Sequence, residues 1–555
     1  MSDRSRALGL VPVLALAGLA ACAAPSSFDG LTGGSSSPKP TSELRTRAAD
    51  STLDAPRQVS PISVTWISTL RPTFTWKNAA GATGAVVEVC NTRACDNDVR
   101  RIEVDGETIS APEDLAPGFW FWRLYSTSKE RVGTKPSATW EFALRGVAAT
   151  GTSDTPAGGI VDVDGDGYAD FIVASEQQDI SFDTGKWTTF PSLNVYFGGR
   201  DGKYHVKDHE LYFPGLPGEA HVAGGVDLDG DGFTDVVRTS KNKDTGEYEV
   251  NVMYGGLGKE WEFEGDKGID IFDYDKKGAP YVVVPGLTTL PVLTNAGDVN
   301  GDGFGDLIIA APNAAVVGLG GAKGPATTMP IAFGEGARGT NTIIGAFDAD
   351  GDRLSDIALA SQRSNSPISA VRGDPQRMQV SADLPTGVIG DAEKAISMVS
   401  GDFDGDGSAD VAAIVPIDGR RHVCFWFATR DRMFAAQAHC EPGPIGDANY
   451  GAHLAAGDLS AKGRDDLLVS GGEGRDSFVE VWGLDGQTTM IDRIQVPGIG
   501  GMLTTIHPGR PGKARWATVD ADGLSILVFE GRTQVQSITN VFRSPKFTRP
   551  IHSIR

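Results

Sequence analysis

Short runs of alternating apolar and polar residues, separated by glycine, proline and asparagine, occupy roughly residues 61 to 144 of this chain. In "RPTFTW" (71–76) and "SATWEFAL" (137–144), alternation places apolar side chains on one face of an extended backbone. The 71 glycines are spread along the chain, which favours many turns and short strands over long helices. The pattern predicts an all-β protein.

The first predicted domain spans residues 61–145. Its segments 71–76, 115–126 and 137–144 resemble strands B, F and G of a fibronectin type III or immunoglobulin-like domain. The resemblance implies a small antiparallel β-sandwich ahead of the rest of the chain.

An aromatic run in this domain allows two interpretations. A strand would direct Trp120, Trp122 and Leu124 to one face and Phe119 and Phe121 to the other. The run is therefore either a sugar-stacking platform or a core strand. We favour the core strand, because aromatic side chains dominate sandwich cores.

An aspartate-rich segment is repeated along the remainder of the chain. Full copies, such as "DVDGDGYADFIVAS" and "DLDGDGFTDVVRTS", begin at residues 162, 227, 298, 348 and 402, and weaker ones begin at 458 and 520. Successive copies start 50 to 71 residues apart, a length that holds four short strands with their turns. Apolar strands ending in a glycine turn, such as "NVYFGGRDGKY" (194–204), form a second mark.

These two marks together resemble the FG-GAP (VCBS) repeats of integrin α-subunit propellers and of bacterial surface proteins. In that family a Phe-Gly pair, a short loop and D-x-D-G-D-G-x-x-D recur once per blade. The seven copies imply a seven-bladed β-propeller over residues 150–555, each blade being a four-stranded antiparallel sheet.

Alternating aspartates separated by glycines are typical of a calcium loop, in which side chains at positions 1, 3 and 5 and the carbonyl at position 7 surround the ion. An aspartate at position 9 would close the shell. We expect about four or five structural calcium ions. The predicted ligands are Asp162, Asp164, Asp166, Tyr168 and Asp170; Asp227, Asp229, Asp231, Phe233 and Asp235; Asp298, Asn300, Asp302, Phe304 and Asp306; Asp348, Asp350, Asp352, Leu354 and Asp356; and Asp402, Asp404, Asp406, Ser408 and Asp410.

The loops differ from EF-hands and from one another. Apolar strands flank them, and position 12 is not the bidentate glutamate of an EF-hand. The alternative for each loop is a metal-free turn whose aspartates cap backbone N–H groups. In copy 4, Arg353 replaces a glycine, and its guanidinium would partly neutralise the cluster. We expect no calcium in copies 6 and 7, because Ser460 and Lys462 replace two ligands and copy 7 stops before position 9.

The N-terminus has the pattern of an export signal. Arg4 and Arg6 precede an apolar stretch (8–21) that is too short for an ordinary membrane span. "LAAC" (19–22) resembles a bacterial lipobox, which implies a signal peptide at 1–21, lipid on Cys22 and a location at the bacterial outer membrane or cell surface. Residues 22–60 are rich in Ser, Thr, Pro and Gly and are predicted to be a disordered tether.

The other four cysteines form two near pairs. Cys90 and Cys95 flank "NTRA", whereas Cys424 and Cys440 lie on two predicted strands joined by a turn at 430–432. In an exported protein we expect both pairs to be disulfides, the alternative being buried free thiols.

Charge and motifs narrow the functional classes. The 72 acidic and 50 basic residues give a net charge of −22, which argues against nucleic acid as a partner. The sequence contains no HExxH, GxSxG or P-loop, and its conspicuous carboxylates belong to repeated loops, so we do not expect an enzyme. The tripeptide Arg372-Gly373-Asp374 falls where other repeats have a glycine turn, and we interpret it as a turn.

The sequence therefore predicts a lipid-anchored surface protein whose calcium-stabilised propeller is a binding or adhesion platform for a protein or glycan ligand. The membrane contact would be the lipid alone. A carbohydrate-binding protein is the main alternative, and an enzyme of extracellular polymers with a site in the central channel is a further one.

Overall fold

The computed structural model describes residues 48–145 and, between 156 and 539, all except 181–186, 207–210, 213–221, 243–244, 257–258, 264–265, 271–281, 313, 326, 333–341, 361–365, 389–390, 430–432, 485–487, 497–502, 507–513 and 521–524. The described residues are all-β, apart from one 3-10 turn, η1 (Gly474–Asp476). Among them, no helix has the length and apolarity needed to cross a membrane. The predicted signal peptide and Cys22 lie outside the described residues.

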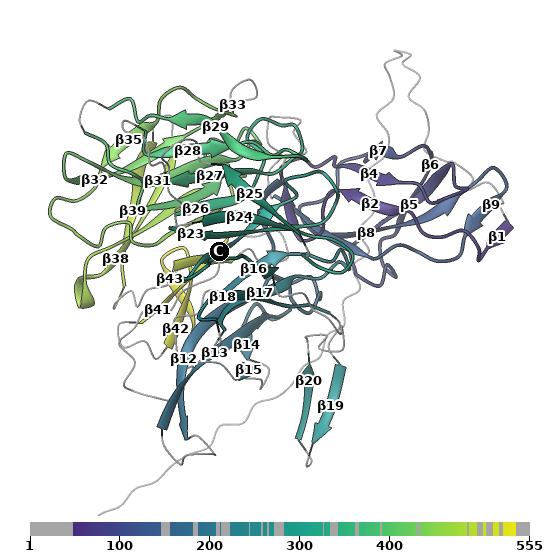
Figure 1. The fold of residues 1–555 in the computed structure, drawn as a ribbon, viewed down its shortest axis with the longest axis horizontal. Helices are drawn as coiled ribbons and strands as arrows, with labels where there is room; N and C mark the ends of the chain where they lie inside the picture. The colour runs from purple at the N-terminus through teal and green to yellow at the C-terminus, as the bar shows by residue number, and fades with distance from the viewer. Residues whose placement is uncertain are drawn as a thin grey trace, which may run out of the picture. The chain divides into compact units, whose positions relative to one another are not determined.

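The N-terminal domain contains two sheets that share one core (Figure 1). Phe74 of one sheet packs on Trp122 of the other, with ring centroids 5.1 Å apart. One sheet contains β1 (Ala48–Asp50), β3 (Thr65–Ile67), β5 (Gly84–Cys90), β6 (Arg100–Asp105), β8 (Gly118–Thr127), β9 (Arg131–Gly133) and β10 (Trp140–Leu144); the other contains β2 (Arg57–Ser60), β4 (Thr73–Lys77) and β7 (Thr108–Ser110).

This domain begins earlier than the sequence indicates. The predicted tether was expected to extend to residue 60, yet β1 and β2 lie within it. The sequences of these strands, AAD and RQVS, show no apolar alternation. Pairing with neighbouring strands, rather than burial of apolar side chains, stabilises them. Strand β1 pairs with β9, where Arg131 Nη1 is 2.9 Å from Asp50 Oδ2, and Gln58 Nε2 donates to the Trp122 carbonyl at 3.1 Å.

The aromatic run forms the middle of strand β8, and both faces of that strand are covered. Trp120 and Trp122 lie in the core of the N-terminal domain, whereas Phe119 packs with Ile160 and Phe171 of the following region. Phe121 is also buried. The structure therefore leaves no exposed sugar-stacking platform along β8.

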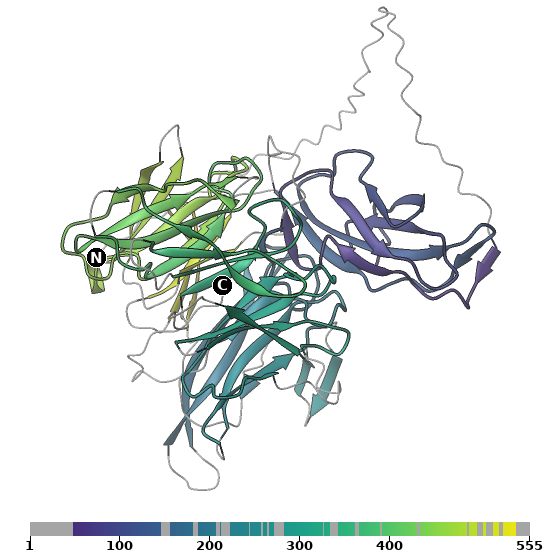
Figure 2. The same cartoon turned by 45° about the horizontal axis from the view of Figure 1, so that its top comes forward.

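The rest of the chain folds into successive antiparallel sheets, most of them of four strands (Figures 1 and 2). The first contains β12 (Phe171–Ile180), β13 (Trp187–Gly198), β14 (Tyr204–Val206) and β15 (Leu211–Tyr212), preceded by β11 (Pro156–Gly159). The following sheets are β16 (Val222–Val226), β17 (Asp235–Lys241), β18 (Tyr248–Met253) and β21 (Val282–Val283); β22 (Val292–Gly297), β23 (Asp306–Ala311), β24 (Ala314–Leu319) and β25 (Thr327–Ala332); β26 (Ile343–Phe347), β27 (Asp356–Ala360), β28 (Ile368–Val371) and β29 (Met378–Leu384); β30 (Ser397–Gly401), β31 (Asp410–Ile417), β32 (Arg420–Trp426) and β35 (His439–Pro442); β36 (Leu454–Gly457), β37 (Asp466–Gly471), β38 (Phe478–Leu484) and β39 (Thr488–Gln495); and β40 (Leu503–Ile506), β41 (Arg515–Val519), β42 (Ser525–Glu530) and β43 (Thr533–Thr539). Two small hairpins, β19 (Lys259–Phe263) with β20 (Asp266–Asp270) and β33 (Ala428–Thr429) with β34 (Met433–Phe434), are added to them.

The sheets form a closed β-propeller. The first strands of successive sheets, from β16 to β40, lie next to one another and line a central cavity. The last sheet packs on the first, since Ile506 and Val519 share a core with Phe171, and Gln536 exchanges two hydrogen bonds with the Tyr204 backbone at 3.0 and 2.8 Å.

The second strands of the sheets explain why alternation disappears in parts of the sequence. All residues of β23, β27 and β37 are buried, because neighbouring sheets cover both of their faces. Continuous apolar runs such as "DLIIAA" are therefore central strands of the propeller.

Candidate metal centres

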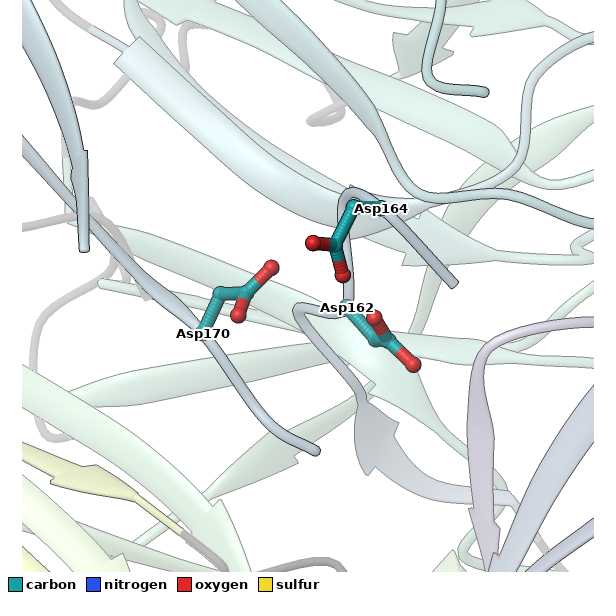
Figure 3. Close-up of side chains that lie close together, drawn as sticks. All are labelled: Asp162, Asp164 and Asp170. Atoms are coloured by element: carbon teal, nitrogen blue, oxygen red, sulfur yellow. The ribbon is translucent and has the colours of Figure 1, made fainter. Parts of the chain in front are cut away.

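Each full aspartate loop ends where the second strand of its sheet begins. Loops 1 to 5 are residues 162–170, 227–235, 298–306, 348–356 and 402–410, and they lead into β12, β17, β23, β27 and β31. In loop 1, one carboxylate oxygen from each of Asp162, Asp164 and Asp170 lies within 4.8 Å of the others (Figure 3). The same grouping occurs in Asp227, Asp229 and Asp235; Asp348, Asp350 and Asp356; and Asp402, Asp404 and Asp410. Loops 1, 2, 4 and 5 therefore bring positions 1, 3 and 9 of the predicted ligand sets together.

The aspartate at position 1 organises the backbone of its own loop. Asp162 accepts hydrogen bonds from the N–H groups of Asp166 at 3.2 Å and Gly167 at 2.8 Å. Glycines at positions 4 and 6 have φ values of +68° (Gly165) and +84° (Gly167), which side chains rarely adopt. In loops 2 to 5 the N–H groups at positions 4 and 6 donate to the position 1 aspartate, which is Asp227, Asp298, Asp348 or Asp402.

The aspartate at position 9 joins its loop to the glycine turn, the second mark seen in the sequence. Asp170 Oδ2 accepts from the N–H of Val163 at 2.8 Å, and its Oδ1 accepts from the N–H of Gly198 at 2.8 Å. The corresponding N–H groups at the ends of the other third strands belong to Gly255 (3.0 Å, to Asp235), Gly320 (2.8 Å, to Asp306), Gly373 (2.9 Å, to Asp356) and Ala428 (2.7 Å, to Asp410).

Close approach explains the glycine in most of these turns. A Cβ atom on Gly198 would lie 2.4 Å from the Ala169 carbonyl oxygen, and one on Gly255 would lie 2.3 Å from the Thr234 carbonyl oxygen. Real Cβ atoms do not come this close, so the loop and the turn pack together only without a side chain. In loop 5 the donor is Ala428, so the corresponding turn accommodates a Cβ atom.

Neighbouring loops are also linked to one another. The position 8 N–H of one loop donates to the position 1 carbonyl of the preceding one: Gly305 to Asp227 at 2.9 Å and Ser355 to Asp298 at 2.8 Å. The Asp465 N–H donates to the Asp402 carbonyl at 2.7 Å in the same way. These bonds tie the loops of adjacent sheets together along one rim of the propeller.

Burial makes the carboxylate clusters electrostatically unfavourable without a counter-charge. Burial raises the pKa of Asp170 well above its usual range, and the charges of Asp162 and Asp164 raise it further. Burial likewise raises the pKa of Asp298 and of Asp402 to about 7. A proton or a cation would relieve this unfavourable charge in the folded protein. All the clustered donors are carboxylate oxygens, which fits a hard divalent cation.

The aspartates at position 5 lie outside these groups. Asp166 Oδ1 accepts from the Tyr168 N–H at 2.9 Å, and the equivalent bonds run from Phe233, Phe304, Leu354 and Ser408 to Asp231, Asp302, Asp352 and Asp406. In loop 3, Asn300 takes position 3 and its Nδ2 donates to Asp302 Oδ2 at 3.1 Å. The position 5 carboxylate therefore stabilises the turn in the structure described here.

In loop 4 the guanidinium of Arg372, which the sequence did not indicate, pairs with the cluster. Arg372 Nε lies 2.5 Å from Asp350 Oδ2, while Arg353 is exposed and adopts a φ of +76°. Arg372 begins the Arg-Gly-Asp tripeptide, whose Gly373 is bonded to Asp356 and whose Asp374 caps the N–H groups of the following turn. The tripeptide is thus built into loop 4 and its turn.

The weaker copies separate into two cases. Copy 6 keeps the loop backbone, since Asp458 accepts from the N–H groups of Lys462 at 2.9 Å and Gly463 at 2.7 Å. In copy 7, Asp520 directly follows the second strand, β41, whereas the first aspartate of each full copy precedes the second strand of its sheet. The rest of this copy, residues 521–524, lies outside the described residues.

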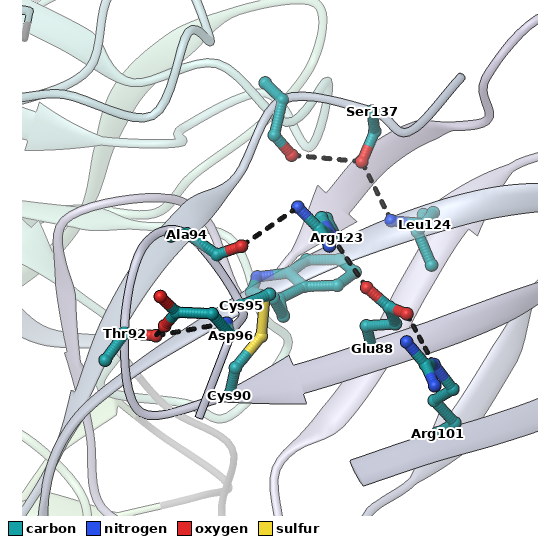
Figure 4. Close-up of a disulfide and its surroundings, with 12 residues drawn as sticks. Glu88, Cys90, Thr92, Ala94, Cys95, Asp96, Arg101, Arg123, Leu124 and Ser137 are labelled. Carbon is teal, nitrogen blue, oxygen red and sulfur yellow. Dashed lines mark hydrogen bonds and ion pairs between the residues drawn. A yellow bond between two sulfur atoms is a disulfide. The ribbon is translucent and has the colours of Figure 1, made fainter. Parts of the chain in front are cut away.

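The structure joins both expected cysteine pairs. Cys90 and Cys95 form a disulfide that closes a short loop in the N-terminal domain (Figure 4). Cys424 and Cys440 form another between directly opposed positions of β32 and β35. The turn predicted at 430–432 lies outside the described residues.

One buried arginine near the loops was not found from the sequence. Arg145, which follows β10, is buried with its Nη2 2.9 Å from Asp465 Oδ2 and its Nη1 3.9 Å from Asp402 Oδ2. It is far from both partners in sequence, and no motif surrounds it. Only the folded structure shows that the Arg145 guanidinium lies between copies 5 and 6 of the repeat.

Comparison with known proteins supports the repeat. A model of the FG-GAP repeat matches residues 293–324, which include most of β22, loop 3, β23 and β24. No curated protein matches the chain. Similar solved structures are rhamnogalacturonan lyase YesW (13% identity, 88% of this chain, 93% of that chain, TM-score 0.31), exotype rhamnogalacturonan lyase YesX (12%, 85%, 90%, 0.30) and the Dos1 propeller (10%, 85%, 93%, 0.30). TM-scores this low support no conclusion about the activity of this chain.

Proposed function

We propose that this protein is a cell-surface lipoprotein whose FG-GAP propeller, held rigid by calcium, is a binding or adhesion platform. The observation that carries the proposal is the convergence of three carboxylates in each of four loops. The matched FG-GAP repeat supports it. We further propose seven blades, the first built on β12–β14 and the last on β40–β43, preceded by a fibronectin type III or immunoglobulin-like sandwich.

Calcium is the proposed ion for two reasons. The converging donors are oxygens only, and the cluster includes buried carboxylates whose charges an ion would offset. Asp162, Asp227, Asp348 and Asp402, with their position 3 and position 9 partners, would hold it. The corresponding loop 3 site would use Asp298, Asn300 and Asp306. Metal analysis of the purified protein should find about four or five calcium ions per chain; a metal-free protein or a different metal would refute this part.

The platform would bind a protein or glycan ligand and would not itself be an enzyme. A glycan array and binding assays with surface proteins separate the adhesion proposal from the carbohydrate-binding alternative. A screen for polysaccharide turnover tests the further alternative, an enzyme of extracellular polymers. Turnover that disappears in Asn295→Ala, which changes a residue lining the central cavity, would overturn the non-enzymatic proposal.

The proposed anchor is a lipid on Cys22 after removal of residues 1–21. The export pattern and the "LAAC" sequence support it. Labelling of cells with a fatty acid analogue should mark the wild-type protein and not Cys22→Ala. Equal labelling of both would refute the anchor.

A further inference from the structure

The N-terminal domain contacts the rim of the propeller that carries the aspartate loops. The Ile160 N–H donates to the Val64 carbonyl at 2.7 Å, and Trp140 Nε1 donates to the Gly230 carbonyl at 2.9 Å. The Arg57 guanidinium donates to the Asp302 carbonyl and lies over the Phe304 ring, 5.7 Å from its centroid. The acceptors Gly230 and Asp302 belong to loops 2 and 3, so the domain binds to backbone of the candidate metal loops themselves.

Arg93 makes the most extensive of these contacts, because it bonds to two loops at once. Its Nε donates to the Gly165 carbonyl in loop 1 at 2.9 Å, and its Nη1 donates to the Gly232 carbonyl in loop 2 at 2.9 Å. The guanidinium also lies 4.0 Å from the centroid of the Phe233 ring of loop 2. A rigid, planar guanidinium can satisfy both carbonyls only when the two loops hold one relative position.

The N-terminal domain holds this guanidinium in place. Arg93 donates to the Thr139 carbonyl at 3.1 Å and to Glu141 Oε2 at 2.7 Å, and it lies 5.1 Å from the centroid of the Phe121 ring. It is carried on the short loop closed by the Cys90–Cys95 disulfide, where Thr92 Oγ1 also donates to Asp96 Oδ1 at 2.7 Å (Figure 4). The side chain is therefore presented from a constrained loop and is only 11% exposed.

The backbone of loop 2 packs directly against the N-terminal domain. A Cβ atom on Gly232 would lie 2.2 Å from the Thr139 carbonyl oxygen. Loops 1 and 2 are two of the four loops in which three carboxylates converge within 4.8 Å. Mutual repulsion of these charges without an ion would open the loops and displace the carbonyls that Arg93 and Trp140 need.

We propose that loops 1 and 2, with their cations bound, form the docking surface for the N-terminal domain, and that Arg93 couples cation binding to docking. The inference rests on the proposed calcium sites. Because coupling is reciprocal, a cation that favours docking must itself be bound more tightly when the domain is docked. Arg93 is a positioning residue here and not an ion ligand.

The test is a calcium titration of the full chain followed by hydrogen exchange of individual segments. In wild type, adding calcium should protect the Ile160 amide and the segments of loops 1 and 2. In Arg93→Gln, the calcium midpoint of loops 1 and 2 should rise by about 10-fold, whereas that of loop 4, two sheets further along the chain, should stay unchanged. Arg101→Gln is the matched control, since Arg101 pairs with Glu88 within the N-terminal domain.

Equal midpoints in Arg93→Gln and wild type, with calcium bound in both, would overturn the docking proposal alone. Interface protection that is the same with calcium and with EDTA would overturn it too. If no segment responds to calcium in wild type, the calcium proposal itself fails. Should Arg93→Gln not fold, Arg93→Lys keeps the charge but loses the two-carbonyl geometry, and the same midpoint shift is expected.

Discussion

The N–H of Gly198 donates a hydrogen bond to Asp170 Oδ1 at 2.8 Å, which joins the first aspartate loop to the end of the third strand, β13. The two marks that recur along the sequence, the aspartate loop and the glycine turn, are therefore two halves of one contact. Their repetition reflects a hydrogen bond made once per sheet from loop 1 to loop 5, with alanine in place of glycine in the fifth.

Replacing Gly198 should destabilise the protein. Gly198→Ala places a Cβ 2.4 Å from the Ala169 carbonyl oxygen, so the loop must move away from the turn. We expect a loss of about 1–3 kcal/mol in the free energy of unfolding, as for other overpacked sites. Gly256→Ala is the matched control, because its Cβ would meet nothing within 4 Å. Denaturant unfolding of the two variants checks this, and equal stability would contradict the contact.

Without metal, stability should fall as pH rises. The pKa of Asp298 and of Asp402 is raised to about 7 in the folded protein, above the ordinary value of 3.8. The folded state therefore binds more protons than the unfolded state between about pH 4 and pH 7. Protonation stabilises the folded state below this range, and that contribution is lost as pH rises through 7. Unfolding in EDTA should show a lower midpoint at pH 8 than at pH 5.

Calcium should reverse this trend, since the ion binds the deprotonated carboxylates. The increase in the unfolding midpoint on adding calcium should therefore be larger at pH 8 than at pH 5. An increase that is the same at both values would argue that the titrating aspartates are not the ligands.

Arg145 should be one of the most sensitive positions outside the loops. Arg145→Met leaves the buried carboxylates of Asp465 and Asp402 without their shared guanidinium, which should destabilise the protein by about 3–5 kcal/mol. Arg71→Met removes an exposed ion pair with Asp114 and should change stability by less than about 1 kcal/mol. Similar effects in the two variants would contradict the buried role of Arg145.

Loss of the Cys424–Cys440 disulfide should also destabilise the propeller. The bond closes a loop between residues 16 apart, and constraining the unfolded chain over such a loop is worth about 3 kcal/mol. A double alanine variant, compared with wild type under non-reducing conditions, measures this contribution. The Cys90–Cys95 pair closes a loop only 5 residues long, so its removal should have a smaller effect. A larger loss of stability on removing Cys90–Cys95 than on removing Cys424–Cys440 would contradict the explanation by loop length.

The sequence was sufficient for the elements that repeat. Period-two alternation located strands such as β4 and β10, and the repeated motif located positions 1, 3 and 9 of the loops, because both are local patterns. Prediction from the sequence failed where strand pairing depends on segments that are distant along the chain. Strands β1 and β2 have a composition typical of a tether, and Asp520, which begins the last copy of the motif, follows the second strand, β41, instead of preceding it.

Local sequence patterns could not predict the contacts between the N-terminal domain and the propeller. Arg93 lies more than 70 residues before its acceptors Gly165 and Gly232, and Arg145 lies more than 250 residues before Asp402 and Asp465. A single arginine has no periodicity or motif that reveals its partner. Such contacts emerge only when the chain is folded.

Thermal unfolding of the full chain with calcium and with EDTA, at pH 8, tests the central claim most directly. If the ion holds the aspartate loops closed, calcium should raise the unfolding midpoint of wild type, and the increase should shrink in Asp235→Asn, which removes a charge from loop 2. Coincident midpoints with calcium and with EDTA would show that the loops are metal-free turns and would contradict the account.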